Sequence, residues 1–246
     1  KQVNLKTCIT LNIKDIRQEF KKFPPSLLQD FDLALKRLKA VKSYTRNTRW
    51  ANLGLSFAQD NPGDLDVVSH YFQAIPEIAA FLRPKDFTLW VNLSETLISD
   101  SPNLAKNYFL ASRKTLSHIH SNELEKWVST GRFFLNGSTQ SVSLASIYFE
   151  KSPAIVRTLK MEQLDRFVRY IELTSRRSPE IASECLQLAE EMFPAKEDGK
   201  EALLQLMAII IRGNSKETLD CFRSIARTTG SVDEETSFRI FSLAHK

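Results

Sequence analysis

Aromatic residues recur along the middle of the chain at the interval expected of stacked helical hairpins. A first aromatic marker stands at Trp50, Trp90, Trp127 and Phe167, with spacings of 40, 37 and 40 residues. A second marker follows each of them after 18 or 21 residues, as Tyr71-Phe72, Tyr108-Phe109, Tyr148-Phe149 and Cys185-Leu186. Self-similarity at such a period is typical of proteins built from helical repeats.

Each marker lies in a stretch with the hydrophobic period of an amphipathic helix. After Trp50 the apolar positions continue at Leu53 and Phe57, which is an i, i+3, i+7 pattern. The residues three and four positions before each second marker are also apolar, which predicts a second helix. A small residue stands four positions after the first three markers, at Gly54, Ser94 and Gly131. We expect these small residues to let a neighbouring helix approach closely.

Two prolines predict how each unit ends. Pro76 and Pro153 stand five residues after a marker tyrosine, where the missing N–H and the ring clash should stop or kink the helix. A short third helix is then expected to close the unit. In the second copy this helix would contain Leu116 and Ile119. The predicted unit is therefore a helical hairpin followed by a short return helix.

These patterns predict an all-α fold, an α-solenoid of HEAT/armadillo-like helical repeats of about 37–40 residues. We expect a single domain over residues 1–246. It would comprise basic N-terminal helices at 1–49, four repeats at 50–200, and a degenerate repeat with the start of a further helix at 201–246. Ser231 and Glu234 form a capping-box pattern that begins this last helix near the end of the chain. We therefore interpret the chain as a fragment of a longer protein.

The composition is that of an ordinary helical protein, and it also predicts where in the cell the protein is located. Of the 246 residues, 42% are hydrophobic and only 7 are glycine. Three cysteines without C-x-x-C spacing predict neither a disulfide framework nor a zinc site. The sequence contains no apolar stretch of the roughly 18 residues needed for a transmembrane helix. A cytoplasmic location is the resulting prediction.

Motifs that would indicate catalysis are missing from the sequence. It contains neither a P-loop nor a glycine-rich dinucleotide turn. His118 and His120 are two residues apart on a predicted helix, so they would point about 200° apart and could not share a metal. Cys185 occupies a marker position, where a small buried side chain is the expected role. We therefore predict that the chain is not an enzyme and that it binds no cofactor or metal.

The six tryptophan and tyrosine markers have two interpretations. They could be platforms on which nucleic-acid bases stack. Their regular spacing favours a second interpretation, in which they form the core of the repeats. The residues concerned are Trp50, Trp90, Trp127, Tyr71, Tyr108 and Tyr148.

Basic residues supply the strongest candidate for a binding surface. Residues 1–50 contain 12 Lys and Arg against 4 Asp and Glu, whereas the remainder of the chain carries a net charge of −3. The candidate residues are Lys36, Arg37, Lys39, Lys42, Arg46 and Arg49, with a second set at Arg166, Arg169, Arg176 and Arg177. We expect the two sets to line the same edge of the stack. A solvated helix face is the alternative interpretation.

The repeat can be written as W-x-x-(L/T)-(G/S), a loop, and A-x-x-Y-F-x-x-(S/I)-P. Its key residues include Trp50, Tyr71-Phe72, Pro76 and Pro153. Over roughly residues 50–195 it resembles the repeats that precede the von Willebrand factor A domain in bacterial proteins of the nitric-oxide-reductase-activation and Rubisco-activase-associated types. The resemblance implies an adaptor that works with a hexameric MoxR-type AAA+ ATPase on a target enzyme. The chain lacks the D-x-S-x-S signature of the von Willebrand domain, so the resemblance implies that this domain lies beyond Lys246.

Two functions remain open from the sequence. The first is a protein-interaction scaffold of the adaptor kind, whose partners would be an AAA+ ATPase and its client enzyme. The second is a nucleic-acid-binding HEAT-like repeat protein, which would use its basic N-terminal helices and could be a base-processing enzyme of the DNA glycosylase kind. The net charge of −3 over residues 51–246 favours the scaffold, because a nucleic-acid backbone requires an extended basic surface.

Overall fold

The computed structural model describes residues 11–41, 48–120, 123–136 and 141–193. It also describes residues 200, 201, 203–205, 207, 220 and 224. This part of the chain is helical and contains no β-strand, so the prediction of an all-α fold of helical repeats is confirmed. Its helices are α1 (Ile13–Phe20), α2 (Pro25–Ala40), α3 (Arg49–Asp60), α4 (Leu65–Phe81), α5 (Pro84–Asp100), α6 (Pro102–Thr115), α7 (Leu124–Asn136), α8 (Ser141–Thr158), α9 (Met161–Ser175) and α10 (Pro179–Met192).

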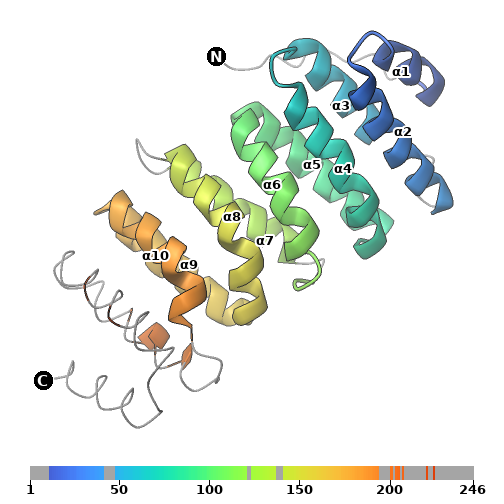
Figure 1. Cartoon of the computed structure of the whole chain (residues 1–246). Coiled ribbons are helices and arrows are strands. Elements are labelled where there is room, and N and C mark those ends of the chain that lie inside the picture. Colours follow the sequence, from blue (N-terminus) through green and yellow to red (C-terminus); the bar gives the residue numbers. More distant parts are fainter. Residues whose placement is uncertain are drawn as a thin grey trace, which may run out of the picture. The chain divides into compact units, whose positions relative to one another are not determined.

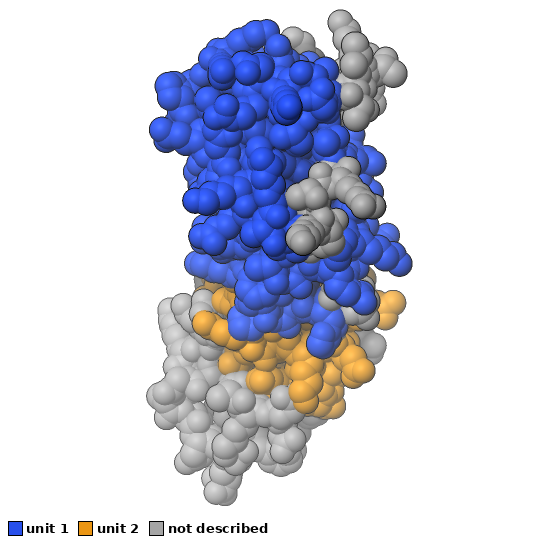
Figure 2. Space-filling view, turned by 90° about the vertical axis from the view of Figure 1, so that its right-hand side faces the viewer, with its two compact units in different colours: residues 1–128 blue, residues 129–246 orange. Residues whose placement is uncertain are grey.

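The chain divides into two compact units, which Figure 2 distinguishes by colour. The first comprises residues 1–128 and the second residues 129–246. The boundary falls inside α7. Each unit is described by itself.

Helices of the first unit form two layers. In Figure 1, α2, α4 and α6 lie side by side in one layer, and α4 contacts both of its neighbours. Helix α3 contacts both α1 and α5 in the other layer. Successive helices pair as the hairpins α1–α2, α3–α4 and α5–α6. The first hairpin, α1–α2, lies within residues 1–49, where basic N-terminal helices were predicted.

Aromatic rings from successive helices fill the core of this unit. The ring of Phe72 meets those of Phe20 and Phe31 edge to face, at centroid distances of 5.3 and 5.5 Å. Tyr71 stacks on Trp90 of the next hairpin at 5.5 Å with nearly parallel rings. Such pairs add to the free energy gained from burying apolar surface. All six tryptophan and tyrosine markers are buried, which confirms that they are core residues and excludes their use as exposed stacking platforms.

The second unit repeats this arrangement with different side chains. Helix α10 contacts both α8 and α9. The ring of Phe134 on α7 packs against Tyr148 on α8, and Phe167 on α9 packs edge to face on Phe193. Cys185 is fully buried at the fourth copy of the second marker, so it packs as a small apolar side chain, as predicted.

The predicted third helix of each unit is wrong. Pro76 and Pro153 lie inside α4 and α8, and both helices continue beyond them. In α4 the residues after the proline include Ile78, which is fully buried. Helix stability in proteins comes mainly from packing of the apolar face, and this packing offsets the lost hydrogen bond. The repeats are therefore helical hairpins.

The glycines after the first markers do permit a close approach, as predicted. A Cβ atom on Gly54 would lie 2.3 Å from Cζ of Phe72, and one on Gly131 would lie 2.2 Å from Cζ of Phe149. In each case a phenylalanine ring from the second helix of the hairpin occupies the space of the missing side chain. The close contact is therefore between ring and backbone.

Candidate protein-binding surface

The exposed face of α2 carries the first three candidate cations. Lys36, Arg37 and Lys39 are exposed, whereas Phe31 and Leu38 of the same helix are buried in the core. Arg37 and Lys39 lie in the last turn of α2, where the partial negative charge of the helix C-terminus favours cations. Lys42 and Arg46 lie outside the described residues.

Two less polar residues share this face. Leu33 and Ala40 are exposed and are placed at i−3 and i+4 relative to Lys36, so they fall on the same side of the helix. Leu33 retains 48% of its accessible surface. We call Leu33, Lys36, Arg37, Lys39 and Ala40 the α2 basic face. Its cations form no ion pair with any residue that the structure describes.

Cations elsewhere in the same layer are used to join neighbouring hairpins. Lys106 on α6 pairs with Asp66 on α4, with Nζ and Oδ2 separated by 2.6 Å, and Arg113 on α6 pairs with Glu77 on α4. The hydrogen bond from Lys106 lowers the pKa of the Asp66 carboxyl, even though partial burial opposes the change. Lys106 and Arg113 are thus neutralised within the unit, whereas the cations of the α2 basic face are not paired with any described residue.

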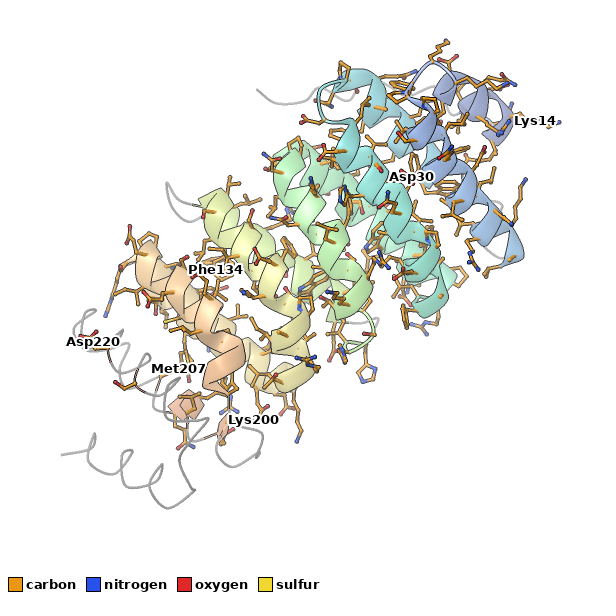
Figure 3. The ribbon with its side chains drawn as sticks, viewed as in Figure 1. Lys14, Asp30, Phe134, Lys200, Met207 and Asp220 are labelled. Atoms are coloured by element: carbon orange, nitrogen blue, oxygen red, sulfur yellow. The ribbon has the colours of Figure 1, made fainter. Side chains whose placement is uncertain are left out.

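Neutral side chains make the corresponding connection between α4 and α2. The Ser69 hydroxyl and the Gln73 amide on α4 both donate hydrogen bonds to the carboxylate of Asp30 on α2, which is labelled in Figure 3. Asp30 thus faces α4, and Arg37 lies two turns further along the same side of α2. The lysines and the arginine of the α2 basic face take no part in this connection.

Two of the predicted binding arginines are engaged within their own unit. Arg49 and Arg166 each stand one residue before a first marker. The Arg49 guanidinium lies 2.7 Å from Glu95 on α5, and Arg166 pairs with Glu201 through two hydrogen bonds. The contact with Arg166 lowers the pKa of the Glu201 carboxyl. Both arginines therefore link one repeat to the next.

The remaining arginines of the second set lie on α9 and at its C-terminal end, where Arg169, Arg176 and Arg177 are exposed. The Arg176 guanidinium carbon lies 5.7 Å from the centroid of the Phe133 ring, a cation–π contact. Burial raises the pKa of Glu172 on the same helix, and the charges of Arg176 and Arg169 oppose this rise. Because the two basic sets belong to different units, the expectation that they share one edge stays a prediction.

The residues that the sequence offered as possible metal ligands or nucleophiles lie in environments that do not favour these roles. His118 and His120 are exposed in the turn that follows α6. Burial raises the pKa of the Cys185 thiol to about 12, so this thiol is protonated at neutral pH and is a poor nucleophile. No group of three or more His, Cys, Asp or Glu side chains within the described ranges could hold a metal ion.

Sequence reasoning missed an asparagine that binds the main chain of a distant residue. The Asn52 Oδ1 atom on α3 accepts a hydrogen bond from the Leu11 N–H at 3.0 Å, and its Nδ2 atom donates to the Leu11 carbonyl at 3.2 Å. The available signal was the W-x-N sequence, since an asparagine follows the first marker by two residues at both Asn52 and Asn92.

Comparisons of the chain with protein-family models, with curated proteins and with solved structures find no significant match. The resemblance to the repeats that precede von Willebrand factor A domains therefore depends on the repeat residues alone. In the part of the chain that the structure describes, no helix combines the length and the apolar character needed to cross a membrane.

Proposed function

We propose that the chain is a cytoplasmic, non-catalytic protein-interaction scaffold that binds an acidic protein surface through the α2 basic face. The observation that carries this proposal is that the exposed cations of α2 lack ion-pair partners, unlike cations elsewhere in the same layer of helices. Two of the three cations on α6, Lys106 and Arg113, are paired with carboxylates on α4. By contrast, Lys36, Arg37 and Lys39 on α2 all lack such a partner among the described residues. A carboxylate-bearing partner would complete the same type of contact.

The buried titratable groups support a structural role for the repeat core. Burial raises the pKa of the hydroxyls of Tyr71, Tyr108 and Tyr148, so none of them ionises near neutral pH. Burial has the same effect on the Cys185 thiol. These groups are suited to packing and hydrogen bonding. The exposed faces of the helices are therefore the better place to look for function.

The resemblance of the repeat suggests which partner to test. By that resemblance, the scaffold couples a hexameric MoxR-type AAA+ ATPase to a target enzyme for its remodelling or activation. ATP hydrolysis would then belong to the partner. The present chain would contribute binding surfaces, with the α2 basic face as one of them.

A charge-reversal experiment tests this proposal. The full chain is used as bait, and the bound proteins are identified and then purified for affinity measurements. We expect an AAA+ ATPase or its client to bind the wild type and to bind the Lys36→Glu/Arg37→Glu variant at least about tenfold more weakly. Lys85→Glu/Lys114→Glu is the matched control, because it makes the same change in net charge at exposed sites on α5 and α6. Equal loss in both variants, or recovery of nucleic acid alone, would overturn the proposal.

Nucleic-acid binding is the second candidate, because the same exposed cations could contact phosphates. It predicts an affinity that falls steeply with salt, with a slope of about one logarithmic unit for each phosphate contact. Binding to duplex and single-stranded DNA and RNA should be measured at about 50 mM salt, where such contacts are strongest. A lack of binding to all of them under this condition would eliminate the candidate.

A further inference from the structure

The hairpin α1–α2 is a further copy of the repeat, as its ring contacts show. Phe31 on α2 stacks on Trp50 at a centroid distance of 5.6 Å and meets Phe72 edge to face at 5.5 Å. Tyr71, the second marker of the next hairpin, contacts the corresponding two rings of the hairpin that follows it, at 5.5 and 5.3 Å. Phe31 therefore occupies the second-marker position of the first hairpin.

In the hairpin α3–α4, the phenylalanine after the marker tyrosine makes the contact with the preceding hairpin. The Phe72 ring fills the space beside Gly54 within its own hairpin. The same ring contacts Phe20 on α1 and Phe31 on α2, at centroid distances of 5.3 and 5.5 Å. Phe109 on α6 likewise lies 5.3 Å from the marker tyrosine on α4. These hairpins are therefore joined to the one before them through an apolar ring at this position.

The first hairpin has a carboxylate where the later hairpins have this phenylalanine. Asp32 directly follows Phe31, so it holds the position of Phe72. The Arg17 guanidinium on α1 donates two hydrogen bonds to the Asp32 carboxylate, each 2.7 Å long. The two side chains retain 44% and 35% of their accessible surface. The side of the hairpin that would receive a preceding repeat therefore carries a pair of charges in contact with water.

The partner of this carboxylate also departs from the repeat. Arg17 stands three positions before Phe20, which is buried on α1. Gly54 stands three positions before Phe57, which is buried on α3. The arginine therefore holds the place of the glycine on which a ring packs in α3–α4. Two changes of residue type have replaced one apolar contact with one ion pair.

We propose that the ion pair between Arg17 and Asp32 closes the stack of repeats at this end, so that no helical hairpin, of this chain or of another copy, packs on the outer side of α1–α2. The outermost repeat of a helical stack needs a polar outer face, because an uncovered apolar face promotes association. Packing a hairpin on this side would remove both charges from water. That desolvation costs more free energy than an exposed ion pair contributes.

Closure of this end keeps part of the α2 basic face accessible. Leu33 directly follows Asp32, and Lys36 lies one turn after Asp32 on the same side of α2. A hairpin packed on this side would cover Lys36. By excluding such a hairpin, the ion pair leaves this part of the face to a partner that binds through charge.

An extra hairpin fused to the full chain tests the proposal. A second copy of residues 48–83, which contains α3 and α4, is attached before Lys1, and the exchange of its amide hydrogens is measured by mass spectrometry. A short helical hairpin that packs on nothing is marginally stable, so its amides exchange quickly. We expect rapid exchange of the added copy on the wild-type chain. On Arg17→Gly/Asp32→Phe, the added copy should exchange at least about tenfold more slowly, because a ring is then available to join it.

A second variant and a control make the result specific. Glycine weakens a helix as short as α1, so Arg17→Ser/Asp32→Phe, which copies Ser94 and Phe109 of the hairpin α5–α6, is measured as well. The exchange of the α1 amides reports in each case whether this helix is intact. Gln29→Phe is the matched control, because it adds a ring at an exposed site one turn before Asp32 and retains the ion pair. The added copy should exchange as rapidly on this control as on the wild type.

Four results would overturn the proposal. The first is slow exchange of the added copy on the wild-type chain, and the second is equal slowing by Gln29→Phe. The third is rapid exchange on both double variants while α1 stays protected. The fourth is loss of α1 protection in both, which would show that the ion pair holds α1 in place. None of these measurements involves a partner of the α2 basic face, so a failure here leaves the proposed function standing.

Discussion

The hairpins α3–α4 and α5–α6 have the same aromatic markers but satisfy the buried polar groups around them differently. In the first hairpin, the Tyr71 hydroxyl donates to the Trp50 carbonyl at 3.1 Å. In the second, the equivalent carbonyl of Trp90 accepts from the Ser94 hydroxyl at 2.8 Å. Gly54 stands where the second hairpin has Ser94, so the first hairpin has no hydroxyl at this position.

The presence of Ser94 in place of a glycine has further consequences in the second hairpin. Hydrogen bonding to Ser112 and Ser94 opposes the burial that raises the pKa of the Tyr108 hydroxyl, so this hydroxyl lies among serines. The Trp90 indole N–H donates to the Ser112 hydroxyl at 3.1 Å, and Ser112 donates in turn to the Tyr108 carbonyl at 2.7 Å. One hairpin therefore packs a ring on glycine, and the other contains a small network of serine hydroxyls.

This difference shows that the repeat specifies where the aromatic rings lie. It does not specify which hydrogen-bond partners their polar atoms have, and these differ between the two hairpins. A tyrosine hydroxyl or a tryptophan N–H in a core must find a partner. Which partner it finds depends on one small residue in the facing helix. Substitutions at these small residues should therefore have effects that differ strongly between the two hairpins.

The largest effect is expected for Gly54→Ala. Its new Cβ would lie 2.3 Å from the Phe72 ring, which is buried among Phe20, Phe31 and Trp50 and has little room to move. We expect this overpacking to lower the free energy of unfolding by about 2 kcal/mol, despite the higher helix propensity of alanine. Urea denaturation followed by circular dichroism measures the change. Ser94→Ala is the matched substitution, and a larger loss there than at Gly54 would contradict the comparison.

Ser112→Ala should have the next largest effect. It removes the acceptor of the Trp90 indole N–H, which is fully buried. An unpaired buried donor costs about 1–3 kcal/mol, so we expect a loss of about 1.5 kcal/mol in the free energy of unfolding. Ser152→Ala is the control, because its hydroxyl donates to the Tyr148 carbonyl of its own helix. Similar losses in both variants would show that the link to Trp90 contributes little.

Asn52→Leu should lower the free energy of unfolding by about 1 kcal/mol, because it leaves the main chain of Leu11 without its side-chain partner. Asn92→Leu in the neighbouring hairpin should cause no loss, since it removes a shielded oxygen that has no donor among the described residues. Thermal melts of the two variants under identical conditions make the comparison. It fails if Asn92→Leu is the less stable protein.

The smallest effect concerns the ion pair that joins the two hairpins. Because Lys106 lowers the pKa of Asp66 in the folded state, the pair stabilises the protein above the ordinary aspartate pKa of about 3.9. This stabilisation is lost as the pH falls through the lowered folded value. Asp66→Asn should therefore be less stable than the wild type at pH 7, by under about 0.5 kcal/mol for so exposed a pair, and equal to it near pH 2. Denaturation at both pH values checks this, with Asp64→Asn as the control.

Most of the fold could be predicted from the sequence because the positions that recur in the repeat indicate which side chains are buried. The spacing of Trp50, Trp90 and Trp127 identified core positions, and the small residues after them indicated a close approach. Pro76 and Pro153 misled the prediction of helix ends, because a proline's local preference is weaker than the packing of a long apolar face. The candidate surface was predicted only in part, since exposure of Lys36 and Arg37 follows from the helical period but the engagement of Arg49 does not.

The sequence by itself determined the all-α class, the repeat and the aromatic core, since hydrophobic periodicity is a local property of the chain. Only the tertiary structure decided which polar groups meet across helices. It placed Arg49 against Glu95, Lys106 against Asp66, and Asn52 against the backbone of Leu11. These partners are some 40 positions apart in the sequence, and their contacts depend on the register between packed helices. That register is set by how the aromatic rings and glycines fit together, and no local pattern records it.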